Sequence, residues 1–183
     1  MTTTKKLITL AILTLLPMMQ MMAQSIEGKW KLADESKKEM EIGDGEAQGD
    51  VFLIFGQTDV SLIFQIGYSD DEFGTIGFEV SMPGEYKIED NVINNSFNED
   101  AADAQINKLD IKNEIKKAMD ASPELKAQFI TALTQEFDKN KGTMINGLKI
   151  LGNGISTMTI DKNDGATLTL KVGEKTIVMN KVE

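Results

Sequence analysis

The segment VSLIFQIGY, residues 60–68, decides the fold class of this chain. Its apolar side chains fall on every second position: Val60, Leu62, Phe64, Ile66 and Tyr68. Polar Ser61 and Gln65 stand between them. Successive side chains of a β-strand point to opposite faces, so this period of two predicts a strand with one apolar face.

Further strands are predicted on both sides of that segment. VFLIFG, residues 51–56, is apolar on both faces, and TIGFEVSM, residues 75–82, alternates. Residues 84–97 are typical of two strands joined at Asp90 and Asn91, which are favourable turn residues.

The C-terminal part of the chain predicts two hairpins. Residues 155–172 hold two alternating segments about Asp164 and Gly165, and Gly173 begins the turn of a second hairpin. The chain as a whole therefore predicts a mainly β, α+β fold with about eight short antiparallel strands.

A helical period interrupts these strands. Apolar residues from Asp100 to Asp120 recur three or four positions apart, and Ser122 followed by Pro123 is typical of the start of a second helix. We therefore predict a helical pair at about 100–141, inserted after the fifth strand. Residues 141–151 leave two alternatives open, because their apolar residues could extend the second helix and their glycines could equally end it.

The first 23 residues predict a secretory signal peptide. Lys5 and Lys6 precede an apolar stretch at 7–22, and Ala23 is a suitable small residue at the cleavage point. The apolar run is interrupted and shorter than the roughly 20 residues of a spanning helix. We therefore expect export to the periplasm or the outside without a lipid anchor, no membrane span after cleavage, and one domain at 24–183.

Composition argues against most catalytic and binding chemistries. The chain contains no Cys, His or Arg and carries a formal net charge of −10. There is accordingly no imidazole base and no thiol nucleophile, and neither is available to bind zinc. The acidic balance disfavours nucleic acid, whose phosphates need a basic surface. We expect a non-enzymatic protein without a metal or cofactor, and a carboxylate-based hydrolase is the second alternative.

The first predicted strand opens with Gly28-Lys29-Trp30, and the last segment is TIVMNKV, residues 176–182. Together with the antiparallel strand order, these residues resemble the calycin superfamily, in particular small secreted bacterial lipocalin-like domains. The resemblance implies a lipocalin-like β-barrel in which Gly28 lets the chain enter the wall closely and Trp30 plugs one end beneath the last strand. Lipocalins place an Arg on this Trp, so Lys171 or Lys181 would have to cover the ring here.

Two sets of residues are candidates for binding. The inward faces of the predicted strands could line a pocket for a small apolar or neutral ligand, or fill the barrel solid: Phe64, Ile66, Ile76, Phe78, Val80, Tyr86, Met158, Ile160, Leu168 and Leu170. The apolar stripe of the second helix could instead meet a protein partner of the cell envelope: Leu125, Phe129, Leu133 and Phe137. We expect a ligand-binding module, with the interaction module as the first alternative.

The helical stripe must in either case be covered. We expect it to pack on the barrel, either over its mouth as a lid or on its outer wall at Phe52 and Ile54 as a brace, and the sequence favours the brace slightly.

Overall fold

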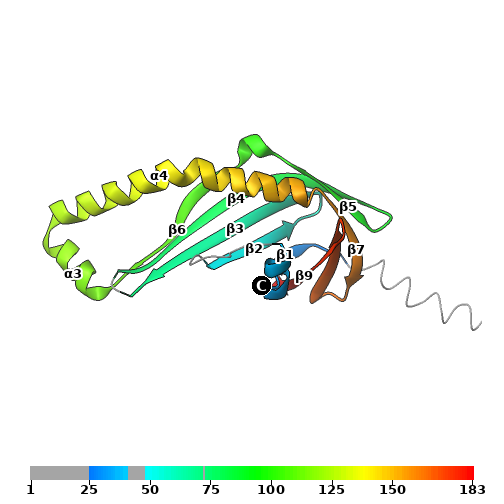
Figure 1. Ribbon diagram of the computed structural model, residues 1–183, viewed down its shortest axis with the longest axis horizontal. Coiled ribbons are helices and arrows are strands. Elements are labelled where there is room, and N and C mark those ends of the chain that lie inside the picture. The colour runs from blue at the N-terminus through cyan, green and yellow to red at the C-terminus, as the bar shows by residue number, and fades with distance from the viewer. Residues whose placement is uncertain (1–24, 41–47, 72) are drawn as a thin grey trace, which may run out of the picture.

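The computed structural model describes residues 25–40, 48–71 and 73–183 (Figure 1). The predicted signal peptide lies outside this part of the chain. The strands are β1 Gly28–Leu32, β2 Gln48–Phe55, β3 Asp59–Asp70, β4 Gly74–Glu89, β5 Val92–Phe97, β6 Asp103–Ile111, β7 Thr157–Asn163, β8 Thr167–Val172 and β9 Lys175–Val182. The helices are α2 Asp34–Glu39, the 3-10 helix η1 Glu99–Ala101, α3 Asn113–Ala121 and α4 Pro123–Gly154.

The strands form a closed antiparallel barrel with one additional strand. Hydrogen-bonded neighbours follow the order β3-β2-β1-β9-β8-β7-β5-β4, and pairing of β3 with β4 closes the ring of eight. The additional strand is β6. It pairs with residues 74–81 of β4, whereas β5 pairs with residues 84–89 of the same strand. The prediction of a mainly β fold with an antiparallel barrel of about eight strands is therefore confirmed.

Strands β3 and β4 are much longer than the others. Their pairing runs without interruption from Asp59 opposite Glu85 to Asp70 opposite Gly74. Because β2 and β5 accompany only part of this hairpin, the remainder projects beyond the barrel with β6 beside it. We call this three-stranded extension of β3, β4 and β6 the blade; it forms the left half of the molecule in Figure 1.

The barrel body is filled by side chains. The largest fully buried ones come from the barrel strands and from one turn of α4: Trp30, Phe55, Leu32, Leu53, Leu62, Met82, Ile93, Leu148, Met158, Leu168, Leu170 and Met179. They form one continuous apolar cluster. An eight-stranded barrel is near the size at which side chains alone occupy the interior, so the solid core follows from these bulky residues.

Trp30 is fully buried, and its Nε1 donates a hydrogen bond to the carbonyl oxygen of Ile26 at 2.6 Å. The ammonium of Lys181, on the last strand, stands 5.3 Å from the centre of the ring, whereas Lys171 pairs with Asp161 instead. Gly28 has a φ of 125°, and a Cβ there would lie 2.7 Å from Lys181 Cε. The entry of β1 therefore needs glycine for its backbone conformation, whereas the flexible end of Lys181 could move aside for a Cβ.

The helical prediction is wrong for the stretch before Asn113. Residues 103–111 form β6, so the two helices follow the sixth strand. The pairing of β6 with β4 shifts register here, because Phe78 faces Ile106 whereas Gly77 faces Lys108. Asn107 is left out of the pairing and forms a β-bulge. The extra residue puts Ile106 and Leu109 three positions apart, a spacing that is typical of a helix, where a regular strand would have them two apart.

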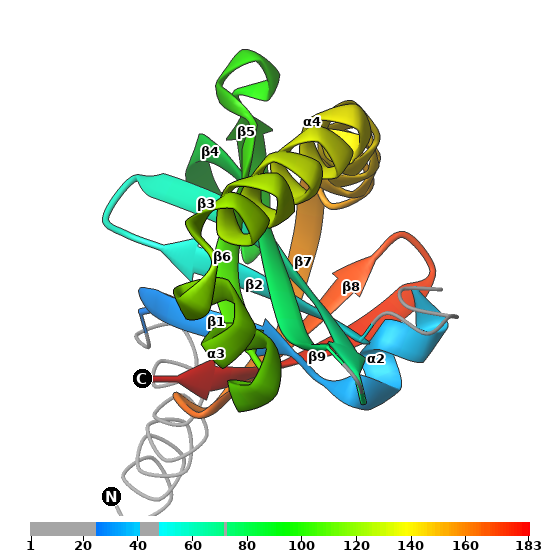
Figure 2. The same ribbon diagram turned by 90° about the vertical axis from the view of Figure 1, so that its left-hand side faces the viewer.

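Helix α4 continues without a break to Gly154, which decides the open alternative at 141–151. It runs lengthwise along β3, β4 and β6 (Figure 1), and Figure 2 shows it foreshortened on one side of these strands. Its C-terminal part enters the barrel core through the buried Leu148 and Gly152. Helix α4 does not pack on the outer wall at Phe52, as the expected brace would. Phe52 is buried there with Lys29 Nζ 4.5 Å from its ring centre. Helix α4 instead covers the other side of the sheet.

Candidate functional site

The predicted pocket residues divide between the barrel core and the blade. Val80, Met158, Leu168 and Leu170 are fully buried in the core and leave no open face. Phe64, Tyr86 and Ile160 are half-buried against the same core, and Ile76 is half-buried on the blade opposite Leu109. The remaining two, Ile66 and Phe78, face helix α4.

Tyr86 is held in place from two sides. Its hydroxyl donates to the carbonyl oxygen of Gly56 at 2.8 Å, and its ring meets Phe55 edge to face with 5.0 Å between centres. Burial, together with the negative charges of Glu27 and Asp59, raises the pKa of the Tyr86 hydroxyl. A phenol that is neutral and already donating acts as a structural clasp between β4 and the end of β2.

An apolar cleft of about 430 Å³ lies between α4 and the blade. The strands contribute Ile66, Tyr68 and Phe78, and the helix contributes Leu133, Glu136, Phe137, Asn140, Thr143 and Met144. Small-molecule pockets are typically about 300–1,000 Å³ and mostly apolar with a few polar groups, and the volume and lining of this half-open cleft agree with those properties. It is the place where the predicted pocket set and the predicted helical stripe meet.

Aromatic rings form the wall of this cleft. The rings of Phe78 and Phe137 stack with centres 5.8 Å apart and planes 5° apart. Tyr68 meets Phe78 edge to face at 6.0 Å. Phe78 therefore connects the helix to β4, the central strand of the blade, and Tyr68 extends the ring contacts to β3. The wall is therefore fixed by ring contacts while the space beside it stays open.

The four residues of the predicted interaction stripe are mostly occupied. Leu133 and Phe137 line the cleft. Phe129 packs on Phe73, in the turn between β3 and β4, with 5.2 Å between ring centres. Leu125 remains exposed, at 45%. A partner would therefore find little of this stripe free.

Five residues of the cleft are absent from both predicted sets. Two of them are the apolar or aromatic residues Met144 and Tyr68, and the other three are the polar helix residues Glu136, Asn140 and Thr143. These three stand three or four positions apart and follow the apolar stripe on its neighbouring side. This spacing indicates that the three polar side chains lie on one side of the helix, because residues at i, i+4 and i+7 are neighbours on a helix surface. It gives no hint, however, that a sheet faces them.

A second hollow, of about 460 Å³, lies at the outer end of the blade and is polar. It is lined by Ser69, Asp71, Gly74, Thr75, Asp110, Ile111, Lys112, Asn113 and Glu114. The ammonium of Lys112 donates to the carbonyl oxygen of Asp71, so this cation already has a partner there. Over the described ranges, no group of three or more His, Cys, Asp or Glu residues is arranged to hold a metal ion.

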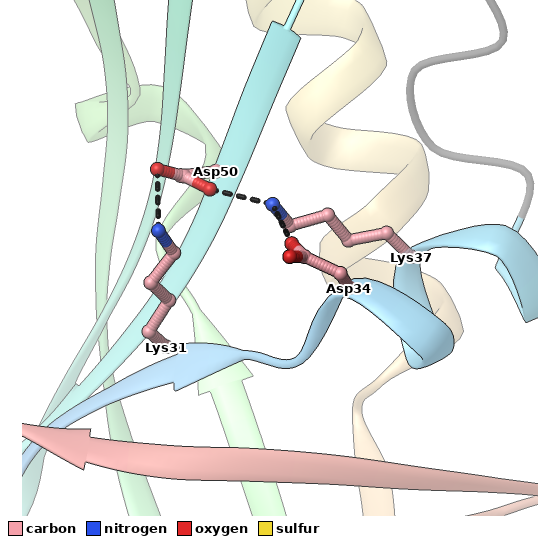
Figure 3. Close-up of polar contacts among 4 residues, drawn as sticks. All are labelled: Lys31, Asp34, Lys37 and Asp50. Atoms are coloured by element: carbon pink, nitrogen blue, oxygen red, sulfur yellow. Dashed lines mark hydrogen bonds and ion pairs between the residues drawn. The ribbon is translucent and has the colours of Figure 1, made fainter.

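A charged cluster joins α2 to the barrel wall (Figure 3). Asp50 pairs with Lys31 at 2.8 Å and with Lys37 at 2.6 Å, and Lys37 also pairs with Asp34 at 2.8 Å. Burial acts to raise the pKa of Asp50, but hydrogen bonds and the charges of the two lysines outweigh it and hold that pKa below its ordinary value. A general acid needs a raised pKa, so this cluster is built to fasten α2 rather than to transfer protons.

Comparison with protein-family models and with curated proteins finds no match. Among the described residues, no helix has the length and apolar character needed to cross a membrane.

Proposed function

We propose that this protein is a non-enzymatic binding module that holds a small, largely apolar molecule in the cleft between α4 and the blade. The observation that carries the proposal is the cleft itself, with an aromatic wall and an open volume of about 430 Å³. The barrel body does not offer an equivalent site, because Val80, Met158, Leu168 and Leu170 fill it. The proposed ligand site is therefore the cleft beneath α4 and not the interior of the barrel.

The free energy available from burying an apolar ligand predicts weak binding in the cleft. Burying about ten methylenes contributes roughly 8 kcal/mol at about 0.8 kcal/mol each. Association costs remove at least about 4 kcal/mol of that. The difference corresponds to a dissociation constant of about 1 mM, and polar contacts at the cleft edge would tighten it.

We also propose that the barrel is of the calycin type. Support comes from the closed ring of eight antiparallel strands, from the buried Trp30 on the first strand, and from Lys181 over its ring on the last. The additional strand β6 and the late helical pair depart from the lipocalin pattern. In this proposal, α4 takes over the role that an open barrel mouth has in lipocalins.

Export is part of the same proposal and rests on the N-terminal sequence alone. Lys5 and Lys6 precede the apolar run, and Ala23 follows it as the cleavage residue. The mature protein should therefore begin near Gln24 or Ser25. N-terminal sequencing of protein from the natural host tests this, and recovery of Lys5 in the mature chain would refute it.

The interaction module and the carboxylate hydrolase have less support. Three of the four stripe residues are packed, and only Leu125 is exposed. The pKa values of Asp34, Asp103 and Asp164 are lowered by hydrogen bonds to lysines or backbone amides, the opposite of what a catalytic acid requires.

A dye titration with a cleft-filling variant tests the binding proposal. N-phenyl-1-naphthylamine is neutral and apolar, and its emission rises when it leaves water. Leu133→Trp should fill the cleft and weaken dye binding at least about tenfold, the loss expected when about 1.4 kcal/mol of contacts disappears. Circular dichroism checks that the variant is folded.

Ile130→Trp is the matched control. Ile130 is on the same helix, is 43% exposed, and does not line the cleft. This variant should bind the dye as the parent does. Equal affinity of all three proteins would place the dye elsewhere and reject the cleft as its site.

A further inference from the structure

The lining of the cleft is polar on one side only. Helix α4 presents an apolar stripe of Leu133, Phe137 and Met144 toward the blade, and the polar residues Glu136, Asn140 and Thr143 run beside it. The strands add Ile66, Phe78 and the ring of Tyr68. A ligand that satisfies both parts has an apolar body between the aromatic residues and one polar head at the Glu136 edge.

The amide donors of this edge, on Asn140, are already in use. The side-chain nitrogen of Asn140 donates to the backbone oxygen of Glu136 at 2.8 Å and to its carboxylate Oε1 at 2.9 Å. A carboxamide has two N–H groups, so both are consumed and its Oδ1 remains as an acceptor. The first of these bonds also fixes which way the amide points, because a carbonyl oxygen can only accept.

Glu136 likewise presents acceptors. Lys139 approaches the same Oε1 at 3.5 Å, and none of the contacts found among the described residues engages Oε2. The hydroxyls of Thr143 and Tyr68 can both donate and accept, so they favour neither kind of head. The net preference of the edge is therefore for a hydrogen-bond donor.

Charge acts in the same direction. The Nζ of Lys141 lies 6.0 Å from the Phe137 ring centre, and Asp103 pairs with this cation at 2.6 Å. The chain carries a formal net charge of −10, which attracts cations to the molecule. The faces of aromatic rings also favour a cation over an anion.

We propose that the molecule bound in this cleft carries a donor head of the amine class, an alkylammonium in preference to a carboxylate or a phosphate. This inference rests on the proposed function. It adds the chemical class of the ligand: an amphiphile whose apolar chain lies between Phe78 and Leu133 and whose ammonium donates to Glu136 and Asn140.

The test compares three compounds that share an eight-carbon chain: octylammonium, 1-octanol and octanoate. Each is titrated into the isotope-labelled protein, and the amide NMR signals of residues 133–144 report binding. Octylammonium should bind most tightly and octanoate most weakly, with about a tenfold ratio between them, because charge-assisted hydrogen bonds favour one and repulsion disfavours the other. Equal affinities for the two ions would overturn the inference.

Two charge-matched variants identify the residue responsible. Glu136→Gln should lower the ratio of octanoate to octylammonium dissociation constants about threefold and leave octanol binding unchanged, as expected for one mostly exposed charge. Glu124→Gln removes the same charge from the start of α4, about 18 Å away along the helix axis, and should leave the ratio unaltered. Equal changes in both variants would mean that overall charge, not Glu136, sets the preference.

Octanol, which carries no charge, distinguishes a failure of the head-group inference from a failure of the proposed binding function. If octanol shifts the cleft amides and Leu133→Trp abolishes this, the proposed function holds whatever the result for the ions. If none of the three compounds shifts them, the proposed function is wrong and the head-group inference falls with it.

Discussion

The ring of Phe137 on α4 lies parallel to the ring of Phe78 on β4, with 5.8 Å between their centres. This contact holds the helix against the blade at the edge of the cleft. It adds to three other attachments of α4: Phe129 on Phe73, the ion pair of Lys141 with Asp103, and the buried C-terminal turns at Leu148 and Gly152. The pair therefore keeps the cleft narrow as well as lining it.

A double-mutant cycle measures that coupling. Phe78→Leu and Phe137→Leu each keep an apolar side chain, so the cycle isolates the ring contact. We expect a coupling free energy of about 0.5–1.5 kcal/mol in chemical unfolding, the usual range for an aromatic pair.

The control cycle pairs Phe78→Leu with Ile130→Ala. Ile130 is exposed on the same helix, so these two changes should add within about 0.5 kcal/mol. A ring pair that couples no more strongly than this control would show that the stacking does not hold α4 in place.

Trp30 gives a second prediction. Its ring is fully buried and its indole N–H bonds to Ile26, so Trp30→Ala should lower the free energy of unfolding by about 3–5 kcal/mol. Lys181→Gln removes only the exposed cation above the ring and should cost about 0.5–1 kcal/mol. The intrinsic fluorescence of the parent should be blue-shifted and poorly quenched by iodide. A Trp30→Ala loss below about 1 kcal/mol would contradict the burial.

The strand residues that could be predicted share one property: their pattern repeats locally. The period of two at 60–68 gives β3, and Asp90 and Asn91, both with positive φ, form the predicted turn between β4 and β5. The burial of Trp30 and its cover by Lys181 also agree with expectation. In these cases the deciding forces act between residues that are close in the chain or paired in register.

The misread segment shows where local pattern fails. A bulge at Asn107 makes the apolar spacing of β6 look helical, and only pairing with β4 reveals the strand. The cleft is harder still to predict, because Ile66 and Phe137 are 71 residues apart in the sequence and line the same cleft only once the blade extends beyond the barrel. The sequence offered both residues as candidates in different sets, and nothing in it joined them.

The charged cluster predicts a dependence of stability on pH. Lys31 and Lys37 lower the pKa of Asp50 in the folded protein against the opposing effect of burial. A lowered carboxylate pKa adds stability above the unfolded value, about 3.9, and that stability is lost as the pH falls through the folded pKa. Asp50→Asn should therefore destabilise by about 0.5–1 kcal/mol at pH 7, allowing for solvent screening of this half-exposed site.

Acid should remove the difference between the two proteins. Below about pH 3.9 the Asp50 carboxylate is protonated first in the unfolded chain, so the advantage of the parent shrinks. It disappears as the pH falls through the lowered pKa of Asp50 in the folded protein, where the parent comes to resemble the variant. Asp138→Asn makes the same charge change at an exposed position of α4 and should leave the stability within about 0.5 kcal/mol at every pH. Unfolding in urea from pH 3 to pH 7 measures all three. A gap between parent and Asp50→Asn that stays constant over this range would contradict the assignment.

Two glycines of α4 should respond in opposite directions to the same substitution. At Gly147 a Cβ would meet no atom within 4 Å, so Gly147→Ala should stabilise by about 0.5–1 kcal/mol through the better helix propensity of alanine. At Gly152 a Cβ would stand 2.3 Å from Met82 Cε and 3.3 Å from Phe97 Cδ2 in the buried core. Gly152→Ala must therefore displace Met82, and overpacking of a core costs about 1–3 kcal/mol, which exceeds the gain in propensity. Thermal and urea unfolding give both signs. A rise in stability for both variants would mean that the C-terminal turn of α4 is not packed into the barrel, and the cleft would then have lost the anchor that sets its width.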